Sequence, residues 1–237
     1  MEEKVSGIVL GGISYGENDK ILKLFTLEKG LISAKIKGVK KAGAKLKFAS
    51  EPFCFAEYII RNGKAGYTVI NASLFDSFYP IREDIFKYYA GATVLEFIKK
   101  FYLENQVSPE IFLSCVSALK SMAYGEDYAS ALVKFLIFAL KDGGYALETH
   151  GCFDCRKEFS ERMFFDYNSG AFYCSECYKG EGREINPQTF LALRKAENGG
   201  ALMIEEGIKA LRLLDYYLDN KAGEQIKSLK ELLKMLA

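Results

Sequence analysis

Four cysteines in the second half of the chain constrain its fold more than any other feature. They form two Cys-x-x-Cys pairs separated by 18 residues: Cys152, Cys155, Cys174 and Cys177. Each pair places two thiolates where one small ion can bind both, and the gap is long enough for a hairpin that brings the pairs together. Four thiolates around one centre form the tetrahedral arrangement of a structural Zn2+ site. The spacing therefore predicts one structural zinc ion, with two disulfides or a redox-active Cys-x-x-Cys pair as the alternatives.

A zinc ion with four protein ligands has no open position for a water molecule, so this site stabilises a fold and does not catalyse a reaction. The sole histidine, His150, lies two residues before the first cysteine. It is an alternative ligand, but with four cysteines available we expect a loop residue beside the site. No G-x-S-x-G, Walker A or H-E-x-x-H motif occurs in the sequence. The sequence therefore indicates a protein that is not an enzyme.

The other two cysteines, Cys54 and Cys115, stand singly among apolar residues and are expected to be buried as small hydrophobic side chains. Unpaired cysteines and a zinc site favour a reducing, intracellular location. The chain has no apolar run of about 18 residues and no signal peptide at its start. We expect a cytoplasmic protein without a membrane partner.

The first third of the chain alternates short β-type segments with glycine. Five strands are predicted, at residues 5–13, 20–27, 31–38, 53–60 and 66–74. Five short, bent strands in so few residues favour a small closed barrel, of which the OB-fold is the common nucleic-acid-binding example. An SH3-like barrel has the same periodicity and remains an alternative.

After Pro80 the apolar residues recur at helical spacing. Helices are predicted at residues 82–103, 109–119, 126–140, 187–197, 202–219 and 223–236. The segment 126–140 is apolar on nearly all sides and should be the central helix of a bundle. The predicted fold is α+β: a five-stranded OB-type barrel at 1–79, a helical domain at 80–147 and 181–237, and a four-cysteine zinc module inserted at 148–180. Metal binding would contribute on the order of 10 kcal/mol to folding of such a module.

The net charge of +1 conceals an uneven distribution. Residues 1–80 carry 12 Lys and Arg against 8 Asp and Glu, a balance of +4, whereas the remainder carries 20 against 23, a balance of −3. Residues 30–50 contain no acid and six lysines: Lys35, Lys37, Lys40, Lys41, Lys45 and Lys47. Such a segment is either a solvated loop or a surface for a polyanion.

Lysines interleaved with aromatic residues suit single-stranded nucleic acid, because the lysines neutralise phosphates and exposed rings stack on bases. Most barrel aromatics, including Phe53, Phe55 and Tyr67, are expected to fill the interior. Tyr15 and Phe48 are the candidate stacking residues. The basic residues near the cysteines either extend the same track or face solvent: Arg156, Lys157, Arg162, Lys179 and Arg183.

Three segments of the barrel carry a resemblance to a known family. The segment from Tyr15 to Thr26 reads Y-G-E-N-D-K-I-L-K-L-F-T, followed by E-K-G-L at 28–31 and K-x-K-G at 35–38. This pattern resembles the amino-terminal signature of the bacterial RecO recombination mediators, and the order of barrel, helices, cysteine pairs and helices is similar over almost the whole chain. The family often has an Arg-rich stretch after the third strand, whereas here Gly38-Val-Lys-Lys41 keeps the charge but loses the bidentate guanidinium.

The resemblance implies a non-catalytic DNA repair protein of the bacterial nucleoid. Such a protein would bind single- and double-stranded DNA through its barrel and anneal complementary strands. With RecR it would help to load RecA onto strands coated by single-strand-binding protein (SSB), whose acidic C-terminal tail docks on the helical domain. The expected DNA contacts are Lys35, Lys37, Lys40 and Lys41, then Lys45 and Lys47, then Arg61 and Lys64 on the next hairpin.

Two other classes of function remain open at this point. A zinc-ribbon adaptor for RNA or protein would fold in the same way without binding DNA. An enzyme with a structural zinc ion would require an acid–base pair that the sequence does not show.

Overall fold

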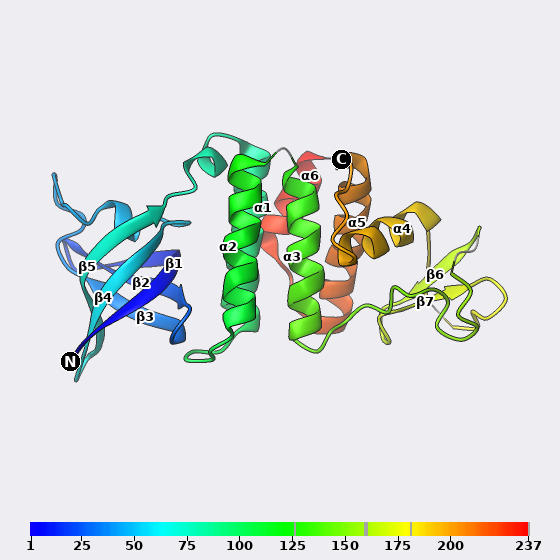
Figure 1. The fold of residues 1–237 in the computed structure, drawn as a ribbon, viewed down its shortest axis with the longest axis horizontal. Helices are drawn as coiled ribbons and strands as arrows, with labels where there is room; N and C mark the ends of the chain where they lie inside the picture. The colour runs from blue at the N-terminus through cyan, green and yellow to red at the C-terminus, as the bar shows by residue number, and fades with distance from the viewer. Residues whose placement is uncertain (126, 159–160, 181, 237) are drawn as a thin grey trace.

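We describe the fold from a computed structural model that covers residues 1–125, 127–158, 161–180 and 182–236. The predicted helix start at 126 and the predicted domain limits 181 and 237 lie outside the described residues. The molecule is elongated, with a β-barrel at one end, helices in the middle and a small sheet at the other end (Figure 1). The α+β fold is as predicted.

The barrel consists of five strands, each close to its predicted position. They are β1 (Glu2–Tyr15), β2 (Asp19–Thr26), β3 (Gly30–Ile36), β4 (Phe55–Gly63) and β5 (Gly66–Asp76). The strands close in the order β1-β2-β3-β5-β4, and β3 and β5 are the parallel pair. This arrangement is that of the OB-fold, which decides between the two barrel types that periodicity left open.

Strand β1 closes the barrel by pairing with two partners. Its first half pairs with β4 and its second half with β2. The register with β2 shifts between Val9 and Gly11, and Gly11 has a φ of 148°, a conformation that L side chains rarely adopt. The glycine therefore allows one strand to bend around the barrel and serve both neighbours.

Six α-helices follow in the described residues, with the bounds α1 (Ile85–Phe101), α2 (Pro109–Tyr124), α3 (Tyr128–Asp142), α4 (Pro187–Glu197), α5 (Ile204–Tyr217) and α6 (Lys227–Met235). Their starts follow local chemistry. The Asp84 carboxylate accepts hydrogen bonds from two N–H groups of α1, Asp127 does the same for α3, and prolines open α2 and α4. Ten of the fifteen α3 residues are buried, so α3 is the central helix that the apolar pattern predicted.

The helices before and after the cysteines form one bundle. Helix α3 packs against α1 and α2 on one side and α4 and α5 on the other, and α6 packs against α1. The barrel joins this bundle through Phe25, whose ring centroid lies 5.6 Å from that of Phe112 and 6.1 Å from that of Tyr102. At the same junction Gly30 has a φ of 65°, and a Cβ there would lie 2.0 Å from the carbonyl oxygen of Gln106. Barrel and helices therefore meet in close, apolar contact.

The cysteine-containing segment forms a three-stranded sheet of β6 (Met163–Asp166), β7 (Ala171–Cys174) and β8 (Arg183–Ile185), in the order β7-β6-β8. One face of the sheet packs on the bundle. The Phe172 ring lies 5.0 Å from Phe190 of α4, and the Phe165 ring lies 5.5 Å from Tyr217 of α5. The small sheet is thus part of the same hydrophobic core as the helices.

None of the helices in the described ranges combines the length and the apolar character needed to cross a membrane.

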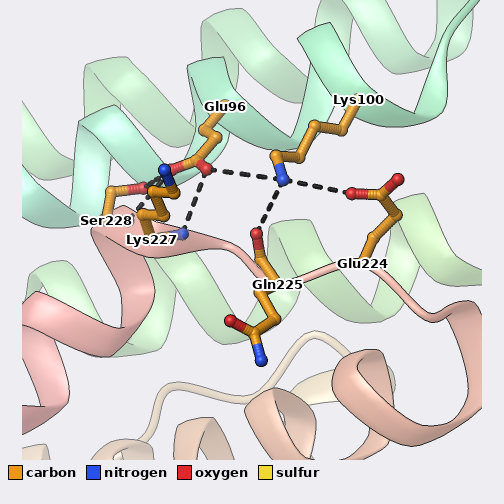
Figure 2. A network of polar contacts seen from close by, with 6 residues as sticks. All are labelled: Glu96, Lys100, Glu224, Gln225, Lys227 and Ser228. Atoms are coloured by element: carbon orange, nitrogen blue, oxygen red, sulfur yellow. Dashed lines mark hydrogen bonds and ion pairs between the residues drawn. The ribbon is translucent and has the colours of Figure 1, made fainter.

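Helix α6 receives its N-terminal cap from α1 and not from its own sequence. The Glu96 carboxylate accepts hydrogen bonds from the N–H groups of Lys227 (3.0 Å) and Ser228 (2.9 Å) and from the Ser228 hydroxyl (2.7 Å) (Figure 2). One turn further along α1, Lys100 donates to the Gln225 carbonyl and pairs with Glu224. A carboxylate at a helix N-terminus satisfies free N–H groups and the helix dipole together.

We predict that Glu96→Ala lowers the free energy of unfolding by about 1–2 kcal/mol, because the first N–H groups of α6 lose their acceptor. The Glu231→Ala variant, which removes an exposed carboxylate from α6 itself, is the matched control and should change stability little. Urea unfolding followed by circular dichroism measures both. Equal stability of the two variants would contradict the capping role.

The same contact predicts a pH dependence. Burial opposes ionisation of Glu96, but hydrogen bonds from Ser228 and Lys227 outweigh it, so the pKa of Glu96 is lowered from its usual 4.5. A lowered carboxyl pKa stabilises the fold above the unfolded-state value, and this stabilisation is lost as the pH falls through the folded-state value. The stability difference between wild type and Glu96→Ala should therefore be full at pH 6 and shrink below about pH 4.5.

Candidate nucleic-acid interface and metal centre

Strand β3 presents its lysines on the outside of the barrel. Alternation buries Ile32, Ala34 and Ile36 in the interior and leaves Lys35 half-buried and Lys37 exposed on the outer face. The register then places Lys35 beside Thr68 of β5, and Thr68 beside Arg61 of β4. Lys35 and Arg61 are therefore two strand spacings apart, about 10 Å, in one cross-strand row.

The segment after β3 is a basic loop whose start is fixed and whose lysines are free. The side chain of Val39 is buried in the barrel core, and the N–H of Lys40 donates to the Asn18 carbonyl at 3.0 Å. Beyond these anchors the loop lysines are exposed: Lys40, Lys41, Lys45 and Lys47. Within the described ranges none of these four, nor Lys37 or Lys64, forms an ion pair with a carboxylate.

The remaining two predicted contacts are already paired. The Lys35 ammonium lies 2.9 Å from the Asp19 carboxylate and 4.3 Å from the centre of the Tyr15 ring. The N–H of Gly38 and the Lys35 ammonium lower the pKa of Asp19, which keeps this acid ionised. Arg61 pairs with Glu2 at 2.5 Å. The structure thus separates six unpaired cations from two whose charge is partly compensated.

The candidate stacking residues differ in exposure. The Tyr15 side chain is 50% exposed at the end of β1 and adjoins Lys35. Phe48 is only half-buried, but it packs against the barrel core in the short helix at Phe48–Ser50. Phe53 is buried, and Phe55 lies between Phe75 and Phe112 at the junction with the helices. Tyr15 therefore fits a stacking role better than Phe48.

A groove beside Tyr15 was not predicted. It has a volume of about 460 Å³ and lies on the outer face of β1, β2 and β3, where α1 adds one residue; its lining is Gly11, Gly12, Ile13, Ile21, Leu22, Lys23, Ser33 and Lys99. The alternation of β2 places Ile21 and Lys23 on the face that carries Lys35, and this signal was readable in the sequence. Lys99 could not be predicted from the sequence, because only the packing of α1 against the barrel brings this residue to the groove.

The four cysteines meet at one point. Their sulfur atoms all lie within 4.8 Å of one another, and the sulfurs of Cys155 and Cys174 are 3.8 Å apart. Two ligands at about 2.3 Å from a tetrahedral zinc ion are separated by about 3.8 Å. All four cysteines are free in the structure, with no disulfide among them. The exposed His150 is not among the clustered groups.

The electrostatics of the cluster suit a cation. Burial opposes ionisation of Cys152, but the N–H groups of Cys155, Cys174 and Asp154 point at its sulfur and lower the pKa of Cys152 to about 6. Hydrogen bonds with Cys155 and Cys174 raise the pKa of Cys177 to about 12. Four neighbouring thiols therefore do not all ionise by themselves. A divalent metal ion would supply the positive charge that lets them ionise together.

Comparison with known proteins places this chain in a family. The family model described as recombination protein O, N terminal, matches residues 1–78, and the model described as recombination protein O, C terminal, matches residues 82–230. The DNA repair protein RecO of Acetivibrio thermocellus is 28% identical over 219 residues, covering 92% of this chain and 80% of that protein. The RecO proteins of Clostridium perfringens and Bacillus subtilis are each 27% identical, covering 97% and 96% of this chain and 96% and 92% of their own lengths. The chain belongs to the recombination protein O (RecO) family of DNA repair proteins.

Proposed function

We propose that this protein is a non-catalytic recombination mediator. It binds single- and double-stranded DNA through the barrel, anneals complementary strands and, with RecR, helps to load RecA onto SSB-coated strands in the bacterial cytoplasm, at the nucleoid. The observation that carries the proposal is the group of six unpaired cations on and beside one outer face of an OB-fold barrel: Lys37, Lys40, Lys41, Lys45, Lys47 and Lys64. Family membership adds the DNA repair role.

The mechanism that we infer is phosphate neutralisation. Two complementary strands repel each other through their phosphates, and lysines that replace the condensed counterions reduce this repulsion. The free ammonium groups of the loop provide the attraction, while Lys35, Arg61 and Thr68 form a fixed row beside them. Because the contacts are to the backbone, they carry no sequence preference. Bases remain available for pairing with the second strand.

We predict that the Lys37/Lys40/Lys41→Glu variant loses annealing of SSB-coated complementary oligonucleotides. For single-strand binding, the logarithm of the affinity falls linearly with the logarithm of the salt concentration, and removing three phosphate contacts should reduce this slope by about two. The control is Lys120/Lys209/Lys234→Glu, which makes the same change of charge at exposed lysines of the helical domain. Strand annealing at rising salt is the measurement, with circular dichroism to check folding. Equal DNA affinity for wild type and both variants would favour the zinc-ribbon adaptor instead.

We infer that the cysteine cluster binds one Zn2+ ion with a structural role. The ligands would be Cys152, Cys155, Cys174 and Cys177. The bound ion would close the loop that runs from the first Cys-x-x-Cys pair to β7. The absence of an open coordination position with four thiolates supports a structural role. The contacts of Phe165 and Phe172 with α4 and α5 support a coupling between metal binding and stability of the bundle.

We predict one zinc ion per chain in protein purified without added metal. The Cys174→Ser variant should lose it and should unfold at a lower temperature, because one ligand and its charge are removed. The His150→Ala variant is the control and should keep both zinc content and melting temperature. Metal analysis and thermal unfolding with and without a chelator test this. Disulfide-paired thiols with no bound metal would contradict the zinc site.

We further infer that the acidic, phenylalanine-ended tail of SSB docks between α2, α3 and α4. Two adjoining hollows of about 190 and 260 Å³ lie there and share Lys134 and Phe138. The Phe138 ring is 41% exposed, and Lys141 stands one further turn along α3. An exposed ring between two ammonium groups fits an apolar side chain flanked by carboxylates.

We predict that Phe138→Ser combined with Lys141→Glu weakens binding of a fluorescent SSB-tail peptide at least tenfold, because both the apolar and the cationic contact are lost. Leu113→Ser combined with Lys120→Glu makes the same chemical changes at exposed positions of α2 and should have little effect. Fluorescence anisotropy gives both affinities. Loss of binding only in the α2 variant would place the tail elsewhere.

A further inference from the structure

The outer face of the four-cysteine module carries a row of aromatic rings that the hydrophobic core does not use. The ring centroids follow one another at 5.9 Å from Phe153 to Tyr173, 5.7 Å from Tyr173 to Tyr178 and 4.6 Å from Tyr178 to Phe164. We call these four residues the ring row. Phe153 lies in the first Cys-x-x-Cys pair, Tyr173 in β7, Tyr178 in the loop after β7 and Phe164 in β6. The fold of the module therefore brings the four rings together.

Strand alternation explains why the ring row faces outward. In β6 and β7 the buried aromatic residues are Phe165 and Phe172, which pack on the bundle. Their neighbours Phe164 and Tyr173 are directly paired across the two strands and lie on the opposite face. The Phe153 side chain is 40% exposed, and the other three rings are partly exposed.

An arginine stands at each end of the ring row. The Arg156 guanidinium lies 5.5 Å from the centre of the Phe153 ring, and the Arg162 guanidinium lies 5.5 Å from the centre of the Phe164 ring. Arg162 is held by two 2.9 Å hydrogen bonds to Glu184, whereas Arg156 is exposed and makes no ion pair within the described part of the chain. Flat rings flanked by flat guanidinium groups are the side chains on which unpaired bases stack.

The charge of the module distinguishes this face from the barrel. Residues 148–180 contain six Asp and Glu against four Lys and Arg, so long-range attraction does not draw a polyphosphate to it. Stacking on the rings is therefore the main source of affinity for nucleic acid that we assign to this face, and stacking requires bases that are not paired. Such a face would discriminate between a single strand and a duplex, which a lysine loop does not do.

We propose that the ring row is a second nucleic-acid contact, specific for single strands, that binds bases by stacking between Arg156 and Arg162. It lies at the opposite end of the molecule from the barrel (Figure 1). A long single strand could contact both ends of the protein. The barrel lysines would bind the phosphates of one segment, and the ring row would bind the bases of another. This goes beyond the proposed function, whose DNA surface is the barrel alone.

The test compares Phe153→Leu/Phe164→Leu, which keeps the apolar volume but removes two rings, with Tyr79→Leu, which removes a ring that is 57% exposed outside the row. Full-length protein is titrated with a long oligothymidylate and with a duplex of equal length, at low and at high salt. Zinc content and circular dichroism verify that each variant is folded. An iodouracil-substituted oligothymidylate is crosslinked by light, and the labelled peptides are mapped by mass spectrometry.

We expect the Phe153→Leu/Phe164→Leu variant to bind the single strand about tenfold more weakly, because it loses two partly exposed stacking contacts. The loss of affinity should be the same at both salt concentrations. Duplex binding and the Tyr79→Leu variant should be unchanged, and crosslinks should map to Phe153 or Tyr173. Equal single-strand affinity for the row variant and Tyr79→Leu, with crosslinks confined to residues 1–80, would overturn the proposal. That result would leave the barrel function intact, because the barrel function is lost only in the lysine variants.

Discussion

The packing of Phe25 against Phe112 and Tyr102 fixes the barrel on the helices, and the arrangement of every candidate surface depends on it. An isolated barrel of this size would bury little apolar area, and its outer face would be free to meet any partner. Here one end of that face is covered by helices, and a single hydrophobic cluster extends from Ile8 in β1 to Phe172 in the four-cysteine module. The contact is close enough that Gly30 has no room for a side chain. The basic loop and the ring row are therefore held apart by a continuous core.

A single acid organises the basic surface of the barrel. Asp19 accepts a hydrogen bond from the Gly38 N–H at 2.8 Å and pairs with Lys35, and so it joins the start of β2 to the end of β3. The loop that follows leaves the barrel from a fixed point, although its lysines remain solvated and unpaired. The Asp19 carboxylate thus removes little of the positive potential of the loop, and it fixes the point from which the loop leaves the barrel.

Local patterns predicted most of the elements but not the way they pair. Alternation in β3 and the prolines that open α2 and α4 are properties of a few neighbouring residues, and each predicted its element within a few positions. The OB-type order depends on the parallel pairing of Ala34 with Tyr67, two residues whose pairing no local period can reveal. The cap of α6 is hidden for the same reason, because Glu96 and Ser228 are 132 residues apart.

The same limit applies to the candidate sites. The cysteine spacing alone located the four-cysteine cluster, because two Cys-x-x-Cys pairs are local motifs and their convergence needs only one hairpin. The sequence ranked Lys35 among the first DNA contacts and Arg61 among the last, whereas the structure pairs Lys35 with Asp19 and Arg61 with Glu2. Each of those acids lies on a different strand from the cation that it neutralises, Asp19 on β2 and Glu2 on β1. Net charge counted over a segment cannot distinguish a free lysine from a paired one.

The position of the module within the chain would give a metal ion bound to its cysteines an effect on more than the module itself. Helices α4 and α5 follow the cysteines, and both pack on α3, the most buried helix of the bundle. They also share their core with the module, through Phe190 with Phe172 and through Tyr217 with Phe165. If four thiolates fold the module only when a cation balances their charge, the aromatic contacts that complete the bundle form with it. The free energy of metal binding would then stabilise the helical domain as well as the module, because the two share one hydrophobic core.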